Sequence, residues 1–175
     1  MIKNNAYTCA DNNNNHHNNH AWLNDLIHRA NIRAEVPAVK EPQDDGKRPG
    51  GLTLVPWQSG PSATWDVTVV HTLAAFYVSQ SAAQAASAAT AASERKSAKY
   101  SSLLSSHIFC PVVIATLGPL ADEAQHLLTE IGRRATRCTA DPREAAFLYQ
   151  RISVAIQRFN AVCLANSLTI SESPS

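Results

Sequence analysis

Two β-rich runs separated by a short turn constrain the fold of this chain more than any other feature. The runs cover residues 52–57 and 63–72, and both are rich in β-branched and aromatic side chains. Gly60 and Pro61 lie in the turn between them, where residues of their type are common. The spacing predicts two antiparallel strands joined as a hairpin.

Helical and β patterns alternate on both sides of this hairpin. Eight of the eleven residues from Ala82 to Ala92 are alanine, the strongest helix former. Pro111 predicts an edge position or a bulge in the strand that contains it. The order of elements predicts an α/β fold, in which a small mixed sheet is flanked by helices and followed by two C-terminal helices. The elements expected outside the hairpin are a helix over 21–32, a strand over 33–41, a loop over 43–51, one long or two broken helices over 73–105, a strand over 107–116, a helix over 120–137 and a last helix that is capped by Thr139 or Asp141 and ends near Leu168.

Composition favours one folded domain and removes one simple argument for function. Of the 175 residues, 45% are hydrophobic and 17% are charged, which favours a folded core over wholesale disorder. The net charge is only +1, so nucleic-acid binding has to be argued from local clusters of charge. Residues 67–93 carry no formal charge but are too rich in polar side chains for a membrane span. With no signal peptide at the start, we expect an intracellular location, in the nucleus or the cytoplasm.

The first nineteen residues form a low-complexity segment in which asparagine recurs, including every residue from 12 to 15. We expect residues 1–19 to be mostly disordered, 20–168 to form the folded domain and 169–175 to be a tail. The cysteines form no CxxC pair, which argues against a complete zinc knuckle. Two interpretations, a metal-binding cluster and a solvated tail, stay open for three histidines of this region, His16, His17 and His20.

Candidate chemistry begins with a carboxylate in an apolar strand. Asp66 alternates with Trp65 and Val67, which puts it on the opposite face of the strand, where an isolated charge is costly unless it is paired or bound to a metal. Lys96 and Lys99 are three residues apart and share one helix face. For Asp66 the competing interpretation is a side chain that faces solvent. For the two lysines it is a solvated C-terminal end of a helix, where the helix dipole favours cations.

Taken in order, several segments carry a resemblance to a known family. The chain resembles the restriction-endonuclease-like domain that follows the reverse transcriptase in some non-LTR retrotransposon reading frames. The resemblance covers residues 20–168. It rests on Leu23-Asn24-Asp25, Lys40-Glu41-Pro42, the segment 46–57, Trp65-Asp66-Val67-Thr68-Val69, Lys96-Ser97-Ala98-Lys99-Tyr100, Thr116-Leu117-Gly118-Pro119 and the segment 150–160.

The resemblance implies a PD-(D/E)xK nuclease fold and Mg²⁺-dependent cleavage of DNA. In that family one carboxylate follows Arg-Pro and a second lies on the next strand of the hairpin, and the pair holds the cation while a lysine activates water. Asp66 matches the second carboxylate, and Lys96 and Lys99 match the lysine pair. The implied partners are DNA and the reverse transcriptase domain of the parent polyprotein, with no membrane. We expect nucleic-acid contacts from Arg48, Arg95 and Tyr100.

Departures from the family pattern predict a damaged site. Gly50 stands where the family has the metal-binding aspartate after Arg-Pro, so the first carboxylate is missing. Glu41 matches a family glutamate and is the candidate metal ligand beside Asp66, with Asp44 and Asp45 as further candidates in the loop. We expect impaired Mg²⁺ binding and little or no cleavage. The alternatives are a non-enzymatic module that binds nucleic acid or protein, and a transposon remnant without function.

Overall fold

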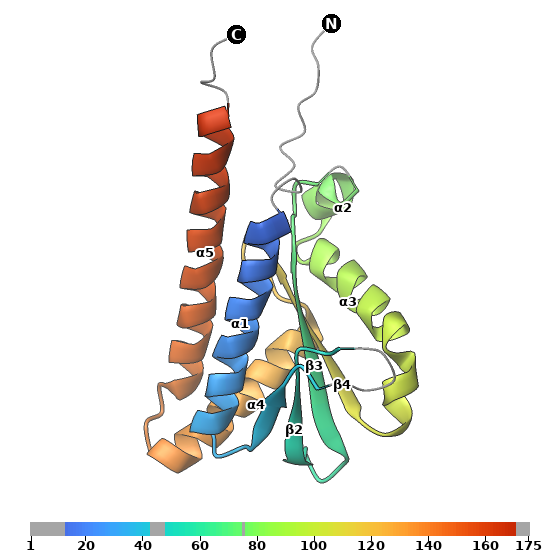
Figure 1. Cartoon of the computed structure of the whole chain (residues 1–175), viewed down its shortest axis with the longest axis vertical. Helices are drawn as coiled ribbons and strands as arrows, with labels where there is room; N and C mark the ends of the chain where they lie inside the picture. Colours follow the sequence, from blue (N-terminus) through green and yellow to red (C-terminus); the bar gives the residue numbers. More distant parts are fainter. Residues whose placement is uncertain (1–12, 43–47, 75, 171–175) are drawn as a thin grey trace, which may run out of the picture.

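Helices cover both faces of a central sheet in the computed structural model, which describes residues 13–42, 48–74 and 76–170 (Figure 1). This arrangement confirms the predicted α/β class, with a small mixed sheet flanked by helices. One face carries α1 (Asn13–Arg33), α4 (Asp122–Thr139) and α5 (Glu144–Ile170), and the other carries α2 (Val78–Ala83), α3 (Ser87–Lys99) and the 3-10 helix η2 (Ser101–Ser105).

The sheet has four strands in the order β1-β2-β3-β4. They are β1 (Ala38–Lys40), β2 (Gly51–Pro56), β3 (Ser62–Val70) and β4 (Ile108–Ala115). The first three pair antiparallel, while β3 and β4 pair parallel, because α2 and α3 carry the chain back across the sheet. β4 therefore lies at the edge, as Pro111 predicted.

The predicted hairpin is present as β2 and β3. Gly51 pairs with Trp65, and the turn closes with a hydrogen bond of 2.8 Å from the Gly60 amide to the Trp57 carbonyl. No β-carbon would fit at Gly51, because it would lie 2.1 Å from an atom of the Trp65 ring. The indole therefore covers β2, and its position fixes which side chains of β3 face α1 and which face α3.

Two core regions separate along these faces. Trp65 and Val67 of β3 are buried with side chains of α1, α4 and α5. Val70 of β3 is instead buried with Ala88 and Ala89 of α3. Alanines on the inner face of α3 bring this helix close to the sheet, so a long polar side chain on α3 can reach β3.

The segment 33–37 corrects one prediction. We expected a strand over 33–41, but only Ala38–Lys40 pairs with β2, and the residues before it form the C-terminal cap of α1. The Val36 amide donates to the Asn31 carbonyl at 2.9 Å while Glu35 has a φ of 54°, which is a Schellman motif. Glycine is the usual residue at the left-handed position of this motif. Because Glu35 takes that place here, the sequence does not indicate that the helix ends at this point.

Other boundaries also differ from the expected ones. The helix α1 begins at Asn13, before the expected start at residue 21, and residues 1–12 lie outside the described part of the chain, so the disorder expected over 1–19 stays a prediction. The long segment 73–105 resolves into the broken alternative, because Ala86 has a φ of 65° just before α3.

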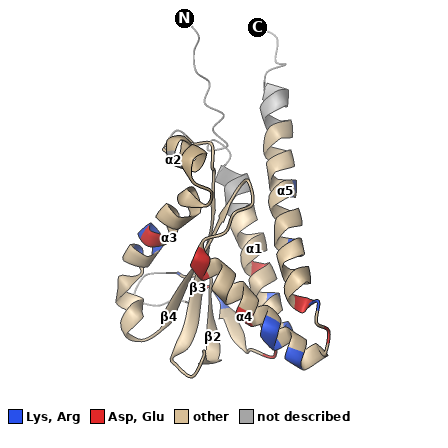
Figure 2. Cartoon of the chain, turned by 180° about the vertical axis from the view of Figure 1, so that it is seen from behind, with Lys and Arg blue, Asp and Glu red and all other residues tan. Residues whose placement is uncertain are grey.

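The last two helices follow their predicted patterns. Asp122 and Glu123 lie in the first turn of α4 and Arg137 in its last turn, an arrangement that suits the helix dipole (Figure 2). Asp141 accepts a hydrogen bond of 2.9 Å from the Arg143 amide just before α5, as a cap does. None of the helices in the described residues is both long and apolar enough to cross a membrane.

Candidate functional site

The candidate site lies where four chain segments meet in one row of the sheet. Asp66 pairs with Pro111 in this row, and in the neighbouring row Lys40 pairs with Gly51 and Gly51 with Trp65. One step along this register, position 50 lies opposite Asp66. The Glu41 amide donates to the Gly50 carbonyl at 3.0 Å, so Glu41 extends the row on the far side of position 50.

Asp66 faces α3 because Trp65 faces α1, and Lys96 reaches it from α3. Nζ of Lys96 donates to Oδ2 of Asp66 and, at 3.2 Å, to the carbonyl of Val67. The side chains of Asp66 and Lys96 are only 16% and 15% exposed. Burial lowers the pKa of the Lys96 ammonium below its ordinary value, although the charge of Asp66 opposes this shift. The two side chains form a largely buried ion pair.

Tyr100 lies next to Asp66. Its hydroxyl donates to the Arg48 carbonyl at 3.4 Å, and the residue is 2% exposed. Burial raises the pKa of the hydroxyl, and the charge of Asp66 and a hydrogen bond to it raise the pKa further. Nζ of Lys99 lies 4.9 Å from the centre of the Tyr100 ring. We call Asp66, Lys96 and Tyr100 the Asp66 cluster.

The Asp66 cluster brings together most of the residues that the sequence singled out. Lys96 and Tyr100 contact Asp66, Lys99 covers the Tyr100 ring, and the main chain of Arg48 accepts from Tyr100. Arg95 points elsewhere, since its guanidinium lies 5.2 Å from the centre of each of the Phe76 and Tyr77 rings.

Position 50 is occupied in a way that the sequence did not reveal. Nδ2 of Asn24 donates to the Gly50 carbonyl at 2.6 Å, and Nε1 of Trp65 donates to Oδ1 of Asn24 at 2.8 Å. A β-carbon at position 50 would lie 2.7 Å from the same Oδ1 atom. Asn24 is 5% exposed on α1. The amide of Asn24 therefore occupies the space that the β-carbon of any side chain at position 50 would need.

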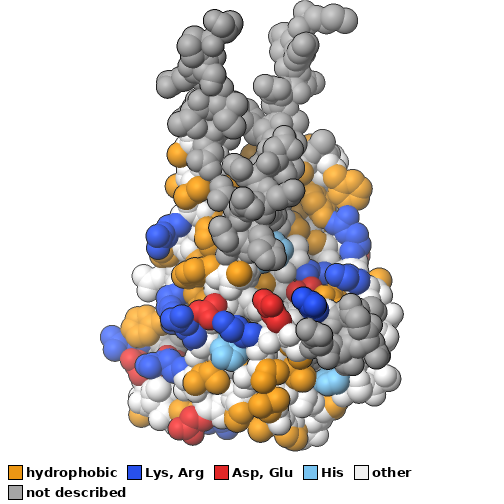
Figure 3. Space-filling model, viewed as in Figure 1, with side chains coloured by type: hydrophobic (Ala, Val, Ile, Leu, Met, Phe, Trp, Pro, Cys, Tyr) orange, Lys and Arg blue, Asp and Glu red, His pale blue; other side chains and the backbone are white. Residues whose placement is uncertain are grey.

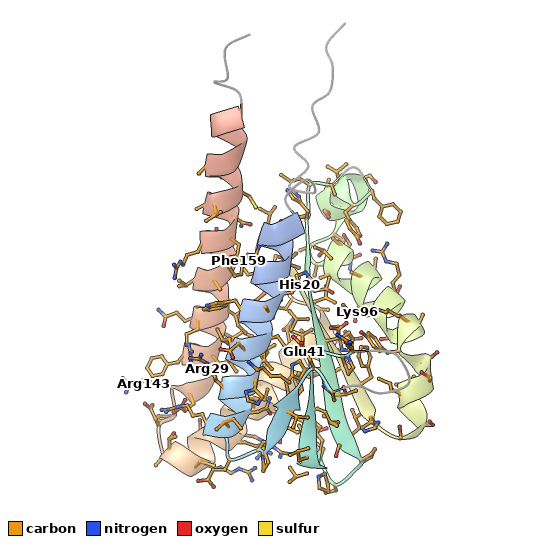
Figure 4. All side chains as sticks on the ribbon, in the orientation of Figure 1. His20, Arg29, Glu41, Lys96, Arg143 and Phe159 are labelled. Atoms are coloured by element: carbon orange, nitrogen blue, oxygen red, sulfur yellow. The ribbon has the colours of Figure 1, made fainter. Side chains whose placement is uncertain are left out.

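Glu41 lies beside position 50, where its role as a metal ligand stays a prediction. Its side chain is exposed, and its φ of 49° ends β1. Figure 4 shows Glu41 and Lys96 at a similar level of the sheet, with Lys96 on the α3 side. The other two candidates, Asp44 and Asp45, lie outside the described residues.

No Mg²⁺ site is assembled among the described residues, and impaired binding of this cation stays a prediction. This cation takes oxygen ligands in near-octahedral geometry, and Oδ2 of Asp66 already accepts from an ammonium group. Within residues 13–42, 48–74 and 76–170, no group of three or more His, Cys, Asp or Glu side chains is placed to hold a metal ion. The side chains of His16 and His17 lie outside the described part, so a histidine metal site stays a prediction.

A cleft of about 630 Å³ lies on the other side of the sheet, between α1, α4 and α5. Two of the charged side chains that line this cleft pair with each other, since Nε of Arg33 donates to both oxygens of Glu144 at 2.8 Å. The remaining lining is mostly apolar and includes Trp22 and Phe147. The cleft offers hydrophobic volume rather than a set of reactive groups.

The Asp66 cluster therefore contains charged groups, but its carboxylate is paired and its hydroxyl does not readily lose a proton. The carboxylate and the ammonium neutralise each other, and the tyrosine hydroxyl keeps its proton because its pKa is raised. Two exposed cationic residues, Arg48 and Lys99, lie next to Tyr100 of the cluster. No family model matches this chain, and the curated proteins likewise include no match to it.

Proposed function

We propose that this chain is an endonuclease-like domain derived from a retroelement, in which the Asp66 cluster has become a structural ion pair that does not cleave DNA. The observation that carries the proposal is the relation between Gly50 and Asp66: Gly50 immediately precedes β2 and, one step beyond the Gly51–Trp65 pair, lies opposite Asp66 of β3. That is where the family resemblance expects its two metal-binding carboxylates. Lys96 reaches Asp66 from α3, as expected for the lysine of such a site.

The missing carboxylate decides against activity. Changes that only reorient metal ligands already cost about 10–100-fold in metal affinity or activity, and removal of a direct ligand costs at least as much. When no metal cation is bound, nothing competes with the Lys96 ammonium for the carboxylate of Asp66. The proposal keeps the partners that the resemblance implies, which are DNA and the reverse transcriptase domain of a parent polyprotein.

A plasmid-nicking assay with Mg²⁺ and with Mn²⁺ tests the proposal. We expect no nicking by the natural chain. The repaired variant should combine Gly50→Asp with Asn24→Ala, because the amide of Asn24 occupies the space needed at position 50. We expect metal-dependent nicking from this double variant, and none when Asp66→Asn is added to it.

Two outcomes contradict the proposal in different ways. Nicking by the natural chain that Asp66→Asn abolishes would show an active site that works with glycine at position 50. A folded double variant that neither nicks DNA nor binds Mn²⁺ in calorimetry would count against an endonuclease-like scaffold.

The second candidate function is binding of nucleic acid without chemistry. Arg95 and Lys99 are exposed and one turn apart on α3, and Arg48 is exposed near the end of this helix, although the chain as a whole is nearly neutral. Binding through such a cluster should weaken linearly when log K is plotted against log salt, and it should need no metal. Absence of DNA binding at about 50 mM salt, where phosphate contacts are strong, would exclude this function.

A further inference from the structure

Three large apolar side chains are exposed in the segment between β3 and α3. Leu73, Phe76 and Val78 are 62%, 69% and 44% exposed. Tyr77 instead packs against the core region that Val70 forms with α3. One aromatic residue therefore anchors the segment while its neighbour presents a ring to solvent.

Arg95 holds this exposed ring in place. Its guanidinium lies 5.2 Å from the centre of the Phe76 ring and equally far from that of Tyr77. The two rings meet edge to face, with centres 5.1 Å apart and planes at 89°. These contacts fix the orientation of Phe76 and still leave most of it open, so a flat group can stack on the exposed face.

Positive charge continues from Arg95 toward the Asp66 cluster. Arg95 and Lys99 are four residues apart on α3, so both lie on its exposed face. Arg48 is also exposed, and the contact of its carbonyl with Tyr100 places it beside the end of α3. Figure 3 shows hydrophobic side chains next to Lys and Arg side chains on this side of the molecule.

We infer that Phe76 and Arg95 form a stacking platform for an unpaired base of a single-stranded nucleic acid, whose phosphates contact Lys99 and Arg48. Aromatic rings beside a cationic track are what single strands bind, since every base has a flat face and every nucleotide carries a negative charge. Bases in a duplex are stacked on each other and cannot reach the ring. The adjoining cations also favour a polyanion over an apolar protein partner.

This inference deepens the proposed function and depends on it for the class of partner. It adds a preference for unpaired strands and a recognition element outside the Asp66 cluster. Cleavage does not enter the inference, so the nicking assay cannot decide it.

The test is metal-free binding of dye-labelled oligonucleotides, followed by fluorescence anisotropy. The natural chain should bind a thymine 20-mer more tightly than a duplex of the same length. Phe76→Ala should weaken binding of the single strand by about tenfold, as expected for loss of one stacked base, and change duplex binding little. Phe76→Trp should retain the affinity. A strand that carries 2-aminopurine should lose fluorescence on binding the natural chain but not the Phe76→Ala variant.

Phe147 provides the matched control. It is 40% exposed on α5, and the guanidinium of Arg143 lies 5.1 Å from its ring centre. Phe147 and Arg143 thus form a pair of the same kind as Phe76 and Arg95, elsewhere on the surface. Phe147→Ala should leave binding unchanged. Circular dichroism checks that both alanine variants are folded.

Each remaining outcome overturns a defined part of the argument. If the natural chain binds DNA but Phe76→Ala binds equally well, the platform is wrong while the proposed function stands. Binding of neither single strands nor duplex at low salt overturns both. If the natural chain instead forms dimers that Phe76→Ala dissociates, the patch is a protein interface and the inference is also wrong.

Discussion

Asn24 donates a hydrogen bond to the carbonyl of Gly50 and at the same time fills the space that a side chain at position 50 would need. Trp65 donates to the same amide, so all three residues are tied together between α1 and the hairpin. The glycine is thus part of a packed arrangement between α1 and the hairpin.

Gly50→Ala tests this packing. A β-carbon at 2.7 Å from Oδ1 of Asn24 forces the amide to move, so we expect the free energy of unfolding to fall by about 1–3 kcal/mol. Urea unfolding measures the loss. The same substitution made in an Asn24→Ala background should cost clearly less, because the space is then open, and equal costs in the two backgrounds would rule out the contact.

Lys96→Met tests the ion pair of the Asp66 cluster. The variant keeps most of the volume of Lys96 but leaves the carboxylate of Asp66 poorly solvated and without its partner cation. We expect a loss of about 3 kcal/mol in the free energy of unfolding at neutral pH. Lys99→Met, at an exposed position on the same helix, should cost less than about 1 kcal/mol. Similar losses in the two variants would mean that the buried pair contributes nothing specific.

Stability at acid pH should depend on Glu130 of α4. Hydrogen bonds from Arg133 and Arg134 hold the pKa of this carboxyl at about 2, against an ordinary value of 4.5. The folded state therefore binds this proton less readily than the unfolded state. The contribution is complete above pH 4.5 and is lost as the pH falls toward 2.

The size of this effect, discounted for solvent screening, is about 1–2 kcal/mol. Urea unfolding of the natural chain and of Glu130→Gln between pH 6 and pH 2 should show a shallower loss of stability in the variant. Arg134→Gln removes one of the two guanidinium partners and should keep part of the slope. Parallel curves for all three proteins would contradict the assignment.

Gly132→Ala probes the contact between α4 and α5. A β-carbon at this position would lie 2.6 Å from Cα of Ala145, which is backbone and cannot turn aside. We expect the two helices to separate slightly and the free energy of unfolding to fall by about 1–3 kcal/mol. Cys138→Ala, on the exposed side of α4, serves as the control and should change stability by less than about 0.5 kcal/mol. Thermal unfolding followed by circular dichroism compares the two.

The sequence predicts the sheet well because its signals are local. The turn at Gly60, the alternation around Trp65 and the proline at position 111 each act on neighbouring residues, and all three features are present as expected. The cap of α1 was missed because Glu35 adopts a backbone conformation that its residue type rarely takes.

The candidate site divides in the same way. Asp66 and Lys96 were found because a carboxylate in an apolar strand needs a partner, and the family resemblance indicated a lysine. Asn24 belongs to one of the segments that carry the resemblance, but its contact at position 50 was missed because this contact depends on Gly50 and Trp65, which are 26 and 41 residues away in the chain. Only the packing of α1 on the hairpin reveals it.

The outer edge of β4 has a consequence for how copies of this chain behave in concentrated solution. Pro111 has no amide hydrogen to offer there, the Ala115 amide donates to the Pro119 carbonyl at 2.8 Å, and the Val113 carbonyl accepts from Ala121 at 3.0 Å. An incoming strand from another molecule would find few open donors or acceptors along this border. The outer edge of β4 is thus protected against edge-to-edge pairing, although β4 contains no charged residue that would repel another strand.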